Sequence, residues 1–108
     1  MYNQKDFSTI ARMIYERMPE ARKIYLFGSY ARGDAKENSD IDIAILSDGQ
    51  MDRKKKMMLL GNLWNDIGAR GFPVEFIIKT LSDFEEEKSL PTLSKIIARE
   101  GMLLWQKT

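Results

Sequence analysis

Apolar residues along the chain alternate between helical and strand-like spacing. Residues 7–18 place apolar side chains three or four positions apart, and Pro19 then interrupts the pattern. A second helical pattern covers about residues 52–69, and a shorter one begins at Pro91. Short runs rich in apolar and β-branched residues predict strands at 23–27, 41–46, 74–78 and 102–105.

This order of elements predicts the fold class. Helices and strands mix along the chain, which favours an α/β (α+β) fold with a small mixed central sheet and helices packed mainly on one side. The long helix between the second and third strands is expected to act as a crossover that makes these two strands parallel.

Several local details are also expected from the pattern. Asp6 or Ser8 is the expected cap of the first helix, and Ser82 with Glu85 fits a capping box before a short helix near residue 84. The last helix is expected to end at Gly101. The inner side of the long helix is predicted to consist of Met57, Leu60, Leu63, Trp64 and Ile67.

Composition narrows the chemistry. The 108 residues are predicted to form one domain, 1–108, too small to include a second substrate-binding domain. The chain has no Cys and no His, which excludes thiolate chemistry, His-based catalysis and zinc sites of the Cys/His type. Catalysis must therefore use other side chains or a metal ion bound by oxygen.

The overall charge and the hydropathy of the chain indicate whether nucleic acids or membranes are expected partners. With 17 basic and 16 acidic side chains the net charge is +1, so direct nucleic-acid binding is not expected from the overall charge. A basic run, residues 53–56, is predicted to be solvated, with RNA or an acidic partner as the alternatives. No apolar run is long enough to span a bilayer, and a cytoplasmic location is expected.

Two carboxylates interrupt the apolar pattern at the start of the second predicted strand. Asp40 and Asp42 are two positions apart, so both project to one face while Ile41 and Ile43 project to the other. A carboxylate in an apolar strand is unfavourable unless something compensates its charge. Mg²⁺ bound by oxygen ligands would do so. The alternative is structural: a capped turn at Ser39-Asp40 and a solvated strand end at Asp42.

The third strand carries a similar interruption at Glu75. If the second and third strands are neighbours, Glu75 completes a cluster of three carboxylates, which fits two-metal phosphoryl or nucleotidyl transfer. Asp40, Asp42 and Glu75 are therefore the predicted catalytic and metal-binding residues, and the two-metal mechanism predicts two bound Mg²⁺ ions. Taken alone, Glu75 is better explained as a charge at the edge of a strand than as a metal ligand.

A glycine-marked loop follows the first strand. Gly28 allows a ligand to approach the backbone closely, Ser29 is expected to cap a short helical turn, and Arg32 is expected to add a charged contact to phosphate. The alternative is an ordinary strand-to-helix turn with a solvated Arg32. Neither a P-loop nor a dinucleotide-binding fingerprint is present.

The combined motif is more specific than its parts. Gly28-Ser29, ten further residues and then Asp40-Ile41-Asp42 lie between two predicted strands. In this pattern the chain resembles the minimal nucleotidyltransferases of the polymerase-beta superfamily. The longer string GSYARGDAKENSDIDIAI, together with the terminal KIIAREGMLLW, is similar to the MNT proteins encoded beside HEPN-domain partners.

The resemblance implies roles for the residues of the motif. Gly28 and Ser29, with Ser39 of the SDID string and Arg32, are expected to bind the nucleotide, and Asp40 and Asp42 are expected to bind metal. Glu75 matches the third acidic position, where Asp is the usual residue of the family.

The resemblance also implies a function: an antitoxin that uses Mg²⁺ to transfer AMP from ATP to a hydroxyl, on a tyrosine, of a HEPN ribonuclease toxin. Because the chain has no acceptor-binding domain, the acceptor is expected to come with the partner protein. Two alternatives stay open. The chain neutralises the toxin by binding alone, or it modifies a small molecule.

Overall fold

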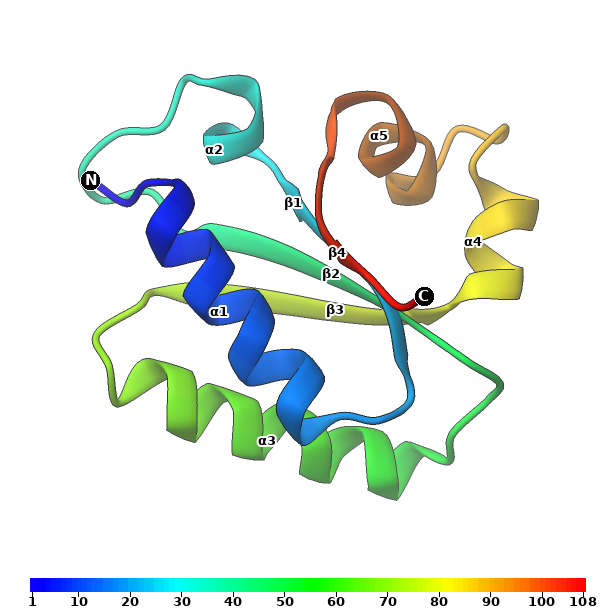
Figure 1. Ribbon diagram of the computed structural model, residues 1–108. Helices are drawn as coiled ribbons and strands as arrows, with labels where there is room; N and C mark the ends of the chain where they lie inside the picture. Colours follow the sequence, from blue (N-terminus) through cyan, green and yellow to red (C-terminus); the bar gives the residue numbers. More distant parts are fainter.

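The computed structural model describes residues 1–108 and has a four-stranded sheet and five helices (Figure 1). The elements follow the predicted order. They are α1 (Gln4–Arg17), β1 (Ala21–Phe27), α2 (Ser29–Arg32), β2 (Ile41–Ser47), α3 (Arg53–Gly68), β3 (Val74–Thr80), α4 (Leu81–Glu87), α5 (Leu93–Glu100) and β4 (Met102–Gln106). No helix is long and apolar enough to cross a membrane.

The sheet is mixed, with strand order β3-β2-β1-β4. Strand β1 lies antiparallel to both β2 and β4, whereas β2 and β3 are parallel. The crossover through α3 is thus confirmed. Because β1 and β2 are antiparallel, the end of β1 lies beside the start of β2, and the parallel β3 starts at the same edge of the sheet.

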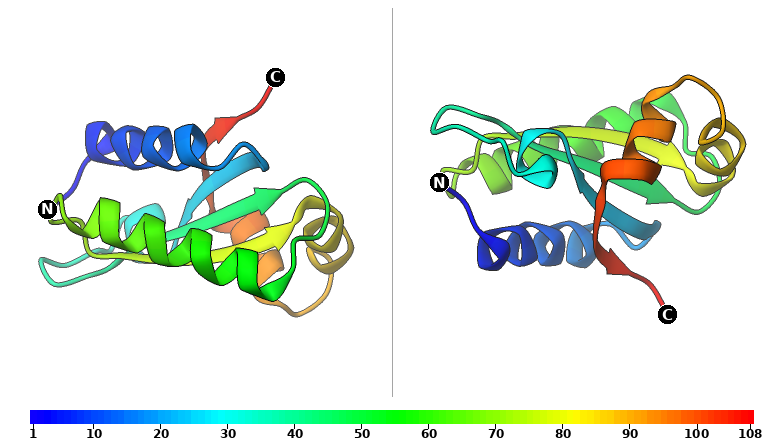
Figure 2. Two further views of the ribbon diagram at one scale, coloured as in Figure 1. Left: turned by 90° about the horizontal axis from the view of Figure 1, so that it is seen from below. Right: turned by 90° about the horizontal axis from the view of Figure 1, so that it is seen from above.

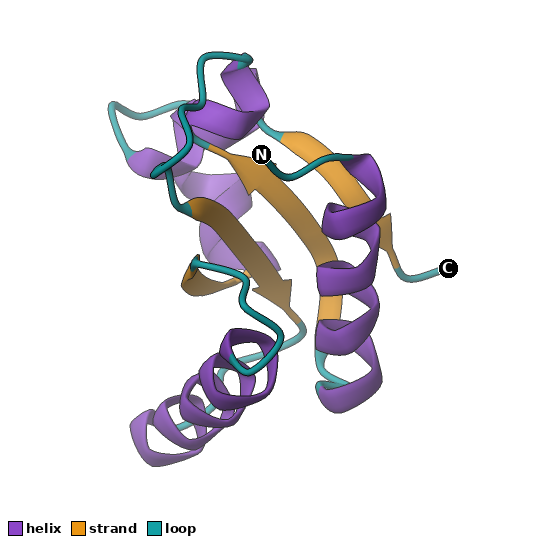
Figure 3. Ribbon diagram, turned by 90° about the vertical axis from the view of Figure 1, so that its left-hand side faces the viewer, coloured by secondary structure: helices purple, strands orange, loops and turns teal.

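Helices cover both faces of the sheet, whereas the sequence predicted packing mainly on one side: α1 and α3 cover one face, and the shorter α4 and α5 cover the other (Figures 2 and 3). The larger core lies under the two long helices, α1 and α3, where Ile41, Ile43 and Ile45 of β2 are fully buried. On the opposite face, Ala44 and Leu46 pack with Phe84 of α4 and Ile97 of α5. The alternation along β2 therefore places Asp42 on the α4–α5 face, opposite the main core.

Two of the predicted helix caps are wrong. The cap of α1 is Asn3, whose side chain accepts hydrogen bonds from the N–H groups of Lys5 and Asp6. Asp6 instead closes the capping box by accepting from the N–H of Asn3. The cap of α4 is Thr80. Helix α4 begins immediately after β3, so the cap is the last strand residue and Ser82 lies inside the helix.

The predicted inner side of α3 is correct for Leu63 and Ile67 but wrong for Met57 and Trp64. Leu63 and Ile67 are buried, whereas 63% of Met57 and 47% of Trp64 are exposed. The indole of Trp64 lies at the edge of the sheet, where its N–H donates to the Val74 carbonyl at 3.1 Å. Strand β3 is an edge strand, so no neighbouring strand donates a hydrogen bond to this carbonyl, and the indole N–H donates one instead.

The C-terminal elements also differ in detail from the expectation. In α5, Ile97 is buried while Leu93 and Ile96 are partly exposed, at 39% and 45%. The predicted strand after Gly101 is present as β4, which pairs with β1. Trp105 is half-buried in this strand and stacks on Tyr15 of α1, with ring centroids 4.7 Å apart.

Candidate functional site

The predicted carboxylates lie at the edge of the sheet where β1 ends and β2 and β3 begin. We call this the Asp42 edge. Phe27 at the end of β1 pairs with Asp42 at the start of β2, and Asp42 pairs with Glu75 at the start of β3. Register partners on adjacent strands project to the same face, so Asp42 and Glu75 are neighbours at a strand spacing of about 4.8 Å. Asp40 lies just before β2 and is exposed. Asp42 and Glu75, which are 33 positions apart in the sequence, are thereby brought together.

Gly28 is fitted to the Asp42 carboxylate. It has φ +75°, a conformation that L side chains rarely adopt. A Cβ atom at this position would lie 2.1 Å from Oδ2 of Asp42. Glycine is therefore required twice, by its backbone conformation and by the carboxylate that lies against its Cα. The pair Gly28 and Asp42 forms the centre of the site.

The charge of Asp42 is poorly compensated. Burial raises the pKa of Asp42, the neighbouring carboxylates of Asp40 and Glu75 raise it further, and Arg32 acts in the opposite direction. None of the three carboxylates accepts a hydrogen bond or forms an ion pair within the chain. An acidic edge that lacks internal partners is suited to binding a cation.

The four-residue helix α2 follows Gly28 directly. Gly28 itself takes the cap position, and no side chain caps this helix, so the predicted capping role of Ser29 is wrong. Ser29 is half-buried and is the first residue of the turn. The ring of Tyr30 anchors the turn to α1 through Phe7, with centroids 5.5 Å apart. A helix start keeps N–H groups without intrahelical partners, which suits an anionic ligand beside Ser29.

The two other predicted nucleotide-binding residues have partners within the chain. Arg32 contacts the carboxylates of Asp34 at 3.3 Å and Glu100 at 3.8 Å, close enough to the site for its charge to lower the pKa of Asp42. The hydroxyl of Ser39 accepts a hydrogen bond from the Lys36 N–H at 2.8 Å and closes the turn before Asp40. Ser39 thus shapes the loop that delivers Asp40.

Sequence reasoning did not anticipate the involvement of Glu100. This residue ends α5, and its contact with Arg32 joins the C-terminal part of the chain to the Gly28–Arg32 turn. Nothing in its local sequence indicates this, because it is 68 positions from Arg32. The tight turn at Gly101, where a Cβ would lie 2.4 Å from the Ile97 carbonyl oxygen, directs β4 away from α5 immediately afterwards.

The donor chemistry fits Mg²⁺, which prefers oxygen ligands and usually binds one or two carboxylates together with phosphate and water. Asp40, Asp42 and Glu75 supply such ligands, and a bound cation would offset the burial and the neighbouring carboxylates that raise the pKa of Asp42. The side chains do not converge on a ready-made centre, however: no group of three acidic residues is arranged to hold a metal ion. The three residues therefore suit Mg²⁺ by their ligand chemistry and their charge, and not by a preformed arrangement.

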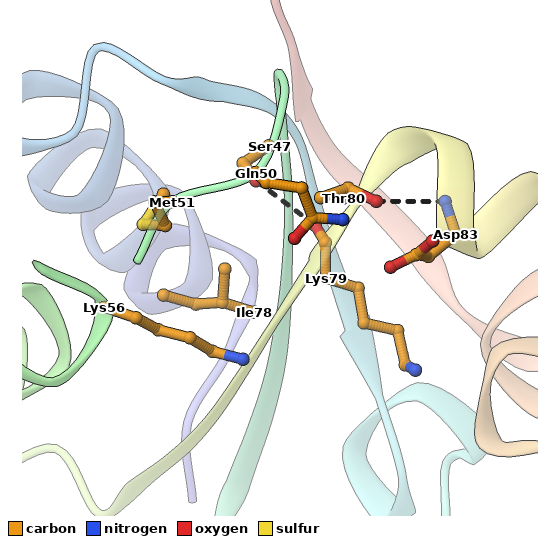
Figure 4. Close-up of a pocket in the computed structure, with 8 residues that line it drawn as sticks. All are labelled: Ser47, Gln50, Met51, Lys56, Ile78, Lys79, Thr80 and Asp83. Atoms are coloured by element: carbon orange, nitrogen blue, oxygen red, sulfur yellow. Dashed lines mark hydrogen bonds between the residues drawn. The ribbon is translucent and has the colours of Figure 1, made fainter. Parts of the chain in front are cut away.

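The surface hollows lie elsewhere. The one in Figure 4 is at the far ends of β2 and β3 and is lined by polar and charged residues that include Ser47, Lys56, Lys79, Thr80 and Asp83. A second hollow lies along α5, and a third lies between α1 and α3. None includes Asp40, Asp42 or Glu75. The charge and the Gly28 geometry, rather than a hollow, mark the candidate site, because a triphosphate can bind along an open edge.

A mixed sheet with a glycine–serine turn against a strand-borne carboxylate defines the nucleotidyltransferase class. The family described as polymerase beta, nucleotidyltransferase, matches residues 9–108. The chain belongs to this family.

Three similar proteins illustrate the relationship. Protein adenylyltransferase MntA of Shewanella oneidensis is 41% identical over 49 residues, which are 45% of this chain and 35% of that protein. A crystal structure of a toxin–antitoxin with AMP-PNP is 26% identical with a TM-score of 0.62, over 99% of this chain and 76% of that chain. At 24% identity, the tri-AMPylated HEPN toxin in complex with MNT antitoxin from Shewanella oneidensis shares the fold, with a TM-score of 0.62 over 97% of this chain and 74% of that one.

The matches to curated relatives are partial. They span between 31% and 52% of the length of those relatives.

Proposed function

We propose that the chain transfers AMP from ATP, with Mg²⁺, to a tyrosine hydroxyl of a HEPN-domain toxin and thereby acts as its antitoxin. The observation that carries this proposal is the contact between Gly28 and the Asp42 carboxylate at the edge shared by Asp40 and Glu75. Family membership and the similarity to MntA, a protein adenylyltransferase, support the reaction class.

The partner follows from the resemblance of the motif to MNT proteins encoded beside HEPN partners. The similarity to a toxin–antitoxin structure with AMP-PNP agrees with it, and also with ATP as the nucleotide. AMP-PNP carries an adenine base and a triphosphate-like tail, so its binding is the behaviour expected of an ATP site.

The residues take the following roles in the proposed reaction. The Gly28–Ser29 turn binds the triphosphate through backbone N–H groups, and Arg32 leaves its exposed partners, Asp34 and Glu100, to contact phosphate. Exposed ion pairs of this kind contribute little, so exchange is inexpensive. Ser39 keeps the loop folded so that Asp40 stays beside Asp42.

Asp40, Asp42 and Glu75 would hold Mg²⁺, which neutralises the charge of the triphosphate when bound. The acceptor oxygen forms a bond to the α-phosphorus, the bond between this phosphorus and the α–β bridging oxygen breaks, and pyrophosphate leaves. Glu75 is exposed at the start of the edge strand β3, beside Asp42, and accepts the proton of the attacking hydroxyl.

Mass spectrometry of the partner tests the proposal. The purified chain is incubated with ATP, Mg²⁺ and the co-expressed HEPN protein, and the mass of the HEPN protein is measured. We expect a gain of one or more AMP groups that is absent with Asp42→Asn. The matched control is Glu86→Gln, an exposed carboxylate on α4, which should transfer normally.

The outcome distinguishes the alternatives. No mass gain, together with full neutralisation of the toxin by Asp42→Asn, would overturn the enzymatic proposal in favour of inhibition by binding alone. A gain on a small hydroxyl compound but not on the HEPN protein would point to the small-molecule reaction.

Glu75 receives its own comparison, because the usual residue of the family at this position is Asp. We expect Glu75→Gln to abolish transfer and Glu75→Asp to retain it, since only the second keeps the carboxylate. Equal rates for the wild type, Glu75→Gln and Glu75→Asp would remove Glu75 from the mechanism while leaving Asp40 and Asp42 in place.

A further inference from the structure

Helix α3 has apolar side chains on its solvent side as well as on its buried side. Met57 and Trp64 are seven positions apart, so they lie on the same side of the helix, and they are 63% and 47% exposed. Met58, beside them, is 60% exposed. The helix runs across the outside of the molecule, on the far side from α2 (Figures 1 and 2).

The first turn of α3 is basic, and most of this charge has no partner within the chain. Lys55 pairs with Glu20, but Arg53, Lys54 and Lys56 form no ion pair. The N-terminus of a helix carries a partial positive charge, so cations are disfavoured there. Asp52 caps the helix, and the first turn itself contains no acidic residue. The positive charge is thus available to an external acidic group.

Gly61 lies between Met57 and Trp64 on this side of the helix. A Cβ at this position would meet no atom within 4 Å, and its φ is not in the left-handed region, so nothing inside the chain requires glycine. Glycine in a helix interior is nevertheless clearly less favourable than alanine. An open notch of this kind lets a second backbone approach closely.

We propose that the outer face of α3, formed by Arg53, Lys54, Met57, Gly61 and Trp64, binds a helix of the partner protein. That helix is inferred to carry carboxylates next to apolar side chains. Its carboxylates would face Arg53 and Lys54, and its apolar side chains would pack on Met57 and Trp64 across Gly61. The inference takes the proposed HEPN protein as the partner, so it rests on that part of the proposed function.

The chemistry of the face favours a protein over a nucleic acid or a membrane. Tryptophan and methionine are enriched in protein interfaces, and methionine adapts to an apolar partner. Phosphate groups would use the cations but leave Met57 and Trp64 exposed. A membrane would need a broad apolar helix face, whereas the apolar face of α3 with Leu63 and Ile67 is already buried in the core.

Titration calorimetry with the co-expressed HEPN protein, repurified as separate chains, tests the inference. We expect Met57→Asp and Lys54→Glu each to weaken binding at least about tenfold. The matched controls are Leu90→Asp and Lys5→Glu, which place the same changes at exposed positions away from α3 and should bind normally. Thermal melts of each variant establish that the fold is intact.

Gly61→Ala gives a second, independent readout. A methyl group in open space should raise the melting temperature of the free chain, because alanine favours the helix. The same methyl group should weaken the complex, because it fills the notch. Higher stability with unchanged affinity would overturn the role of Gly61 and of close helix packing.

The inference and the proposed function fail in different ways. Wild-type affinity in Met57→Asp and Lys54→Glu, with AMP transfer intact, would overturn the α3 interface alone. Loss of binding in these variants, together with no AMP transfer by the wild type, would support the interface and overturn the catalytic proposal. If the variants instead lose binding to anionic vesicles, to RNA or to a second copy of the chain, the partner helix is the wrong occupant.

Discussion

The Asp42 edge and the outer face of α3 both contain residues that are unfavourable for their local structure, but only the first is explained inside the chain. At the edge, the positive φ of Gly28 and the approach of the Asp42 carboxylate account for each other. On α3, Gly61, the basic first turn and the exposed Met57 have no such internal counterpart. The chain therefore sets the backbone geometry of the candidate site, although the carboxylates there lack internal partners, whereas the proposed docking face has no internal counterpart.

The largest effect that separates the two regions is expected from Gly28→Ala. The new Cβ would meet Oδ2 of Asp42 and the backbone would be strained, so we expect a destabilisation of about 1–3 kcal/mol. AMP transfer should fall at least about a hundredfold, because the carboxylate is displaced by an ångström or more. Denaturant unfolding and the mass-spectrometric assay measure the two effects.

Gly33→Ala is the matched control for this change. Gly33 also has a positive φ of +85°, but a Cβ there meets nothing within 4 Å. Strain alone predicts a loss of about 1–2 kcal/mol with transfer largely retained. If Gly33→Ala reduces transfer as strongly as Gly28→Ala, the contact with Asp42 is not what makes Gly28 necessary.

A smaller effect is expected from Asp42→Asn on the stability of the free chain. Because burial raises the pKa of Asp42, the folded state keeps this proton to higher pH than the unfolded state. Stability is therefore lost as pH rises from the ordinary value of 3.8 through the raised folded value. In metal-free buffer at pH 7, Asp42→Asn should melt a few degrees higher than the wild type, and the difference should close below the ordinary pKa.

Mg²⁺ should reverse this order. Binding to the folded state raises the melting temperature of the wild type, and Asn at position 42 removes a charged ligand, so the variant should respond less. Equal responses of the two proteins to Mg²⁺ would place the cation elsewhere on the surface.

The smallest effect concerns the one cation of the α3 turn that is paired. The hydrogen bond from Lys55 lowers the pKa of Glu20, so this pair stabilises the fold above the ordinary value of 4.5 and loses its contribution as pH falls through the lowered folded value. Lys55→Gln should lower the melting temperature slightly at pH 7, and the difference should shrink as pH falls through the lowered folded value, as expected for a pair close to solvent. Binding of the partner should be unchanged, in contrast to Lys54→Glu.

Much of the fold could be predicted from the periodicity of the chain. The apolar runs of β1, β2 and β3 and the helical spacing of α1 and α3 are strong local signals, and the helix between β2 and β3 predicted their parallel arrangement. The caps at Asn3 and Thr80 were missed because several residues near a helix start have the same capping chemistry. Met57 and Trp64 were misplaced because apolar character by itself does not tell a buried helix side from an exposed one.

The sequence by itself determined the chemistry of the candidate site: Gly28-Ser29 and Asp40-x-Asp42 at a set spacing, oxygen ligands and no thiol or imidazole. Only the tertiary structure decided the neighbours, because register is a property of two strands. Pairing placed Asp42 between Phe27 and Glu75, and packing brought Glu100 to Arg32 and turned Met57 and Trp64 outward.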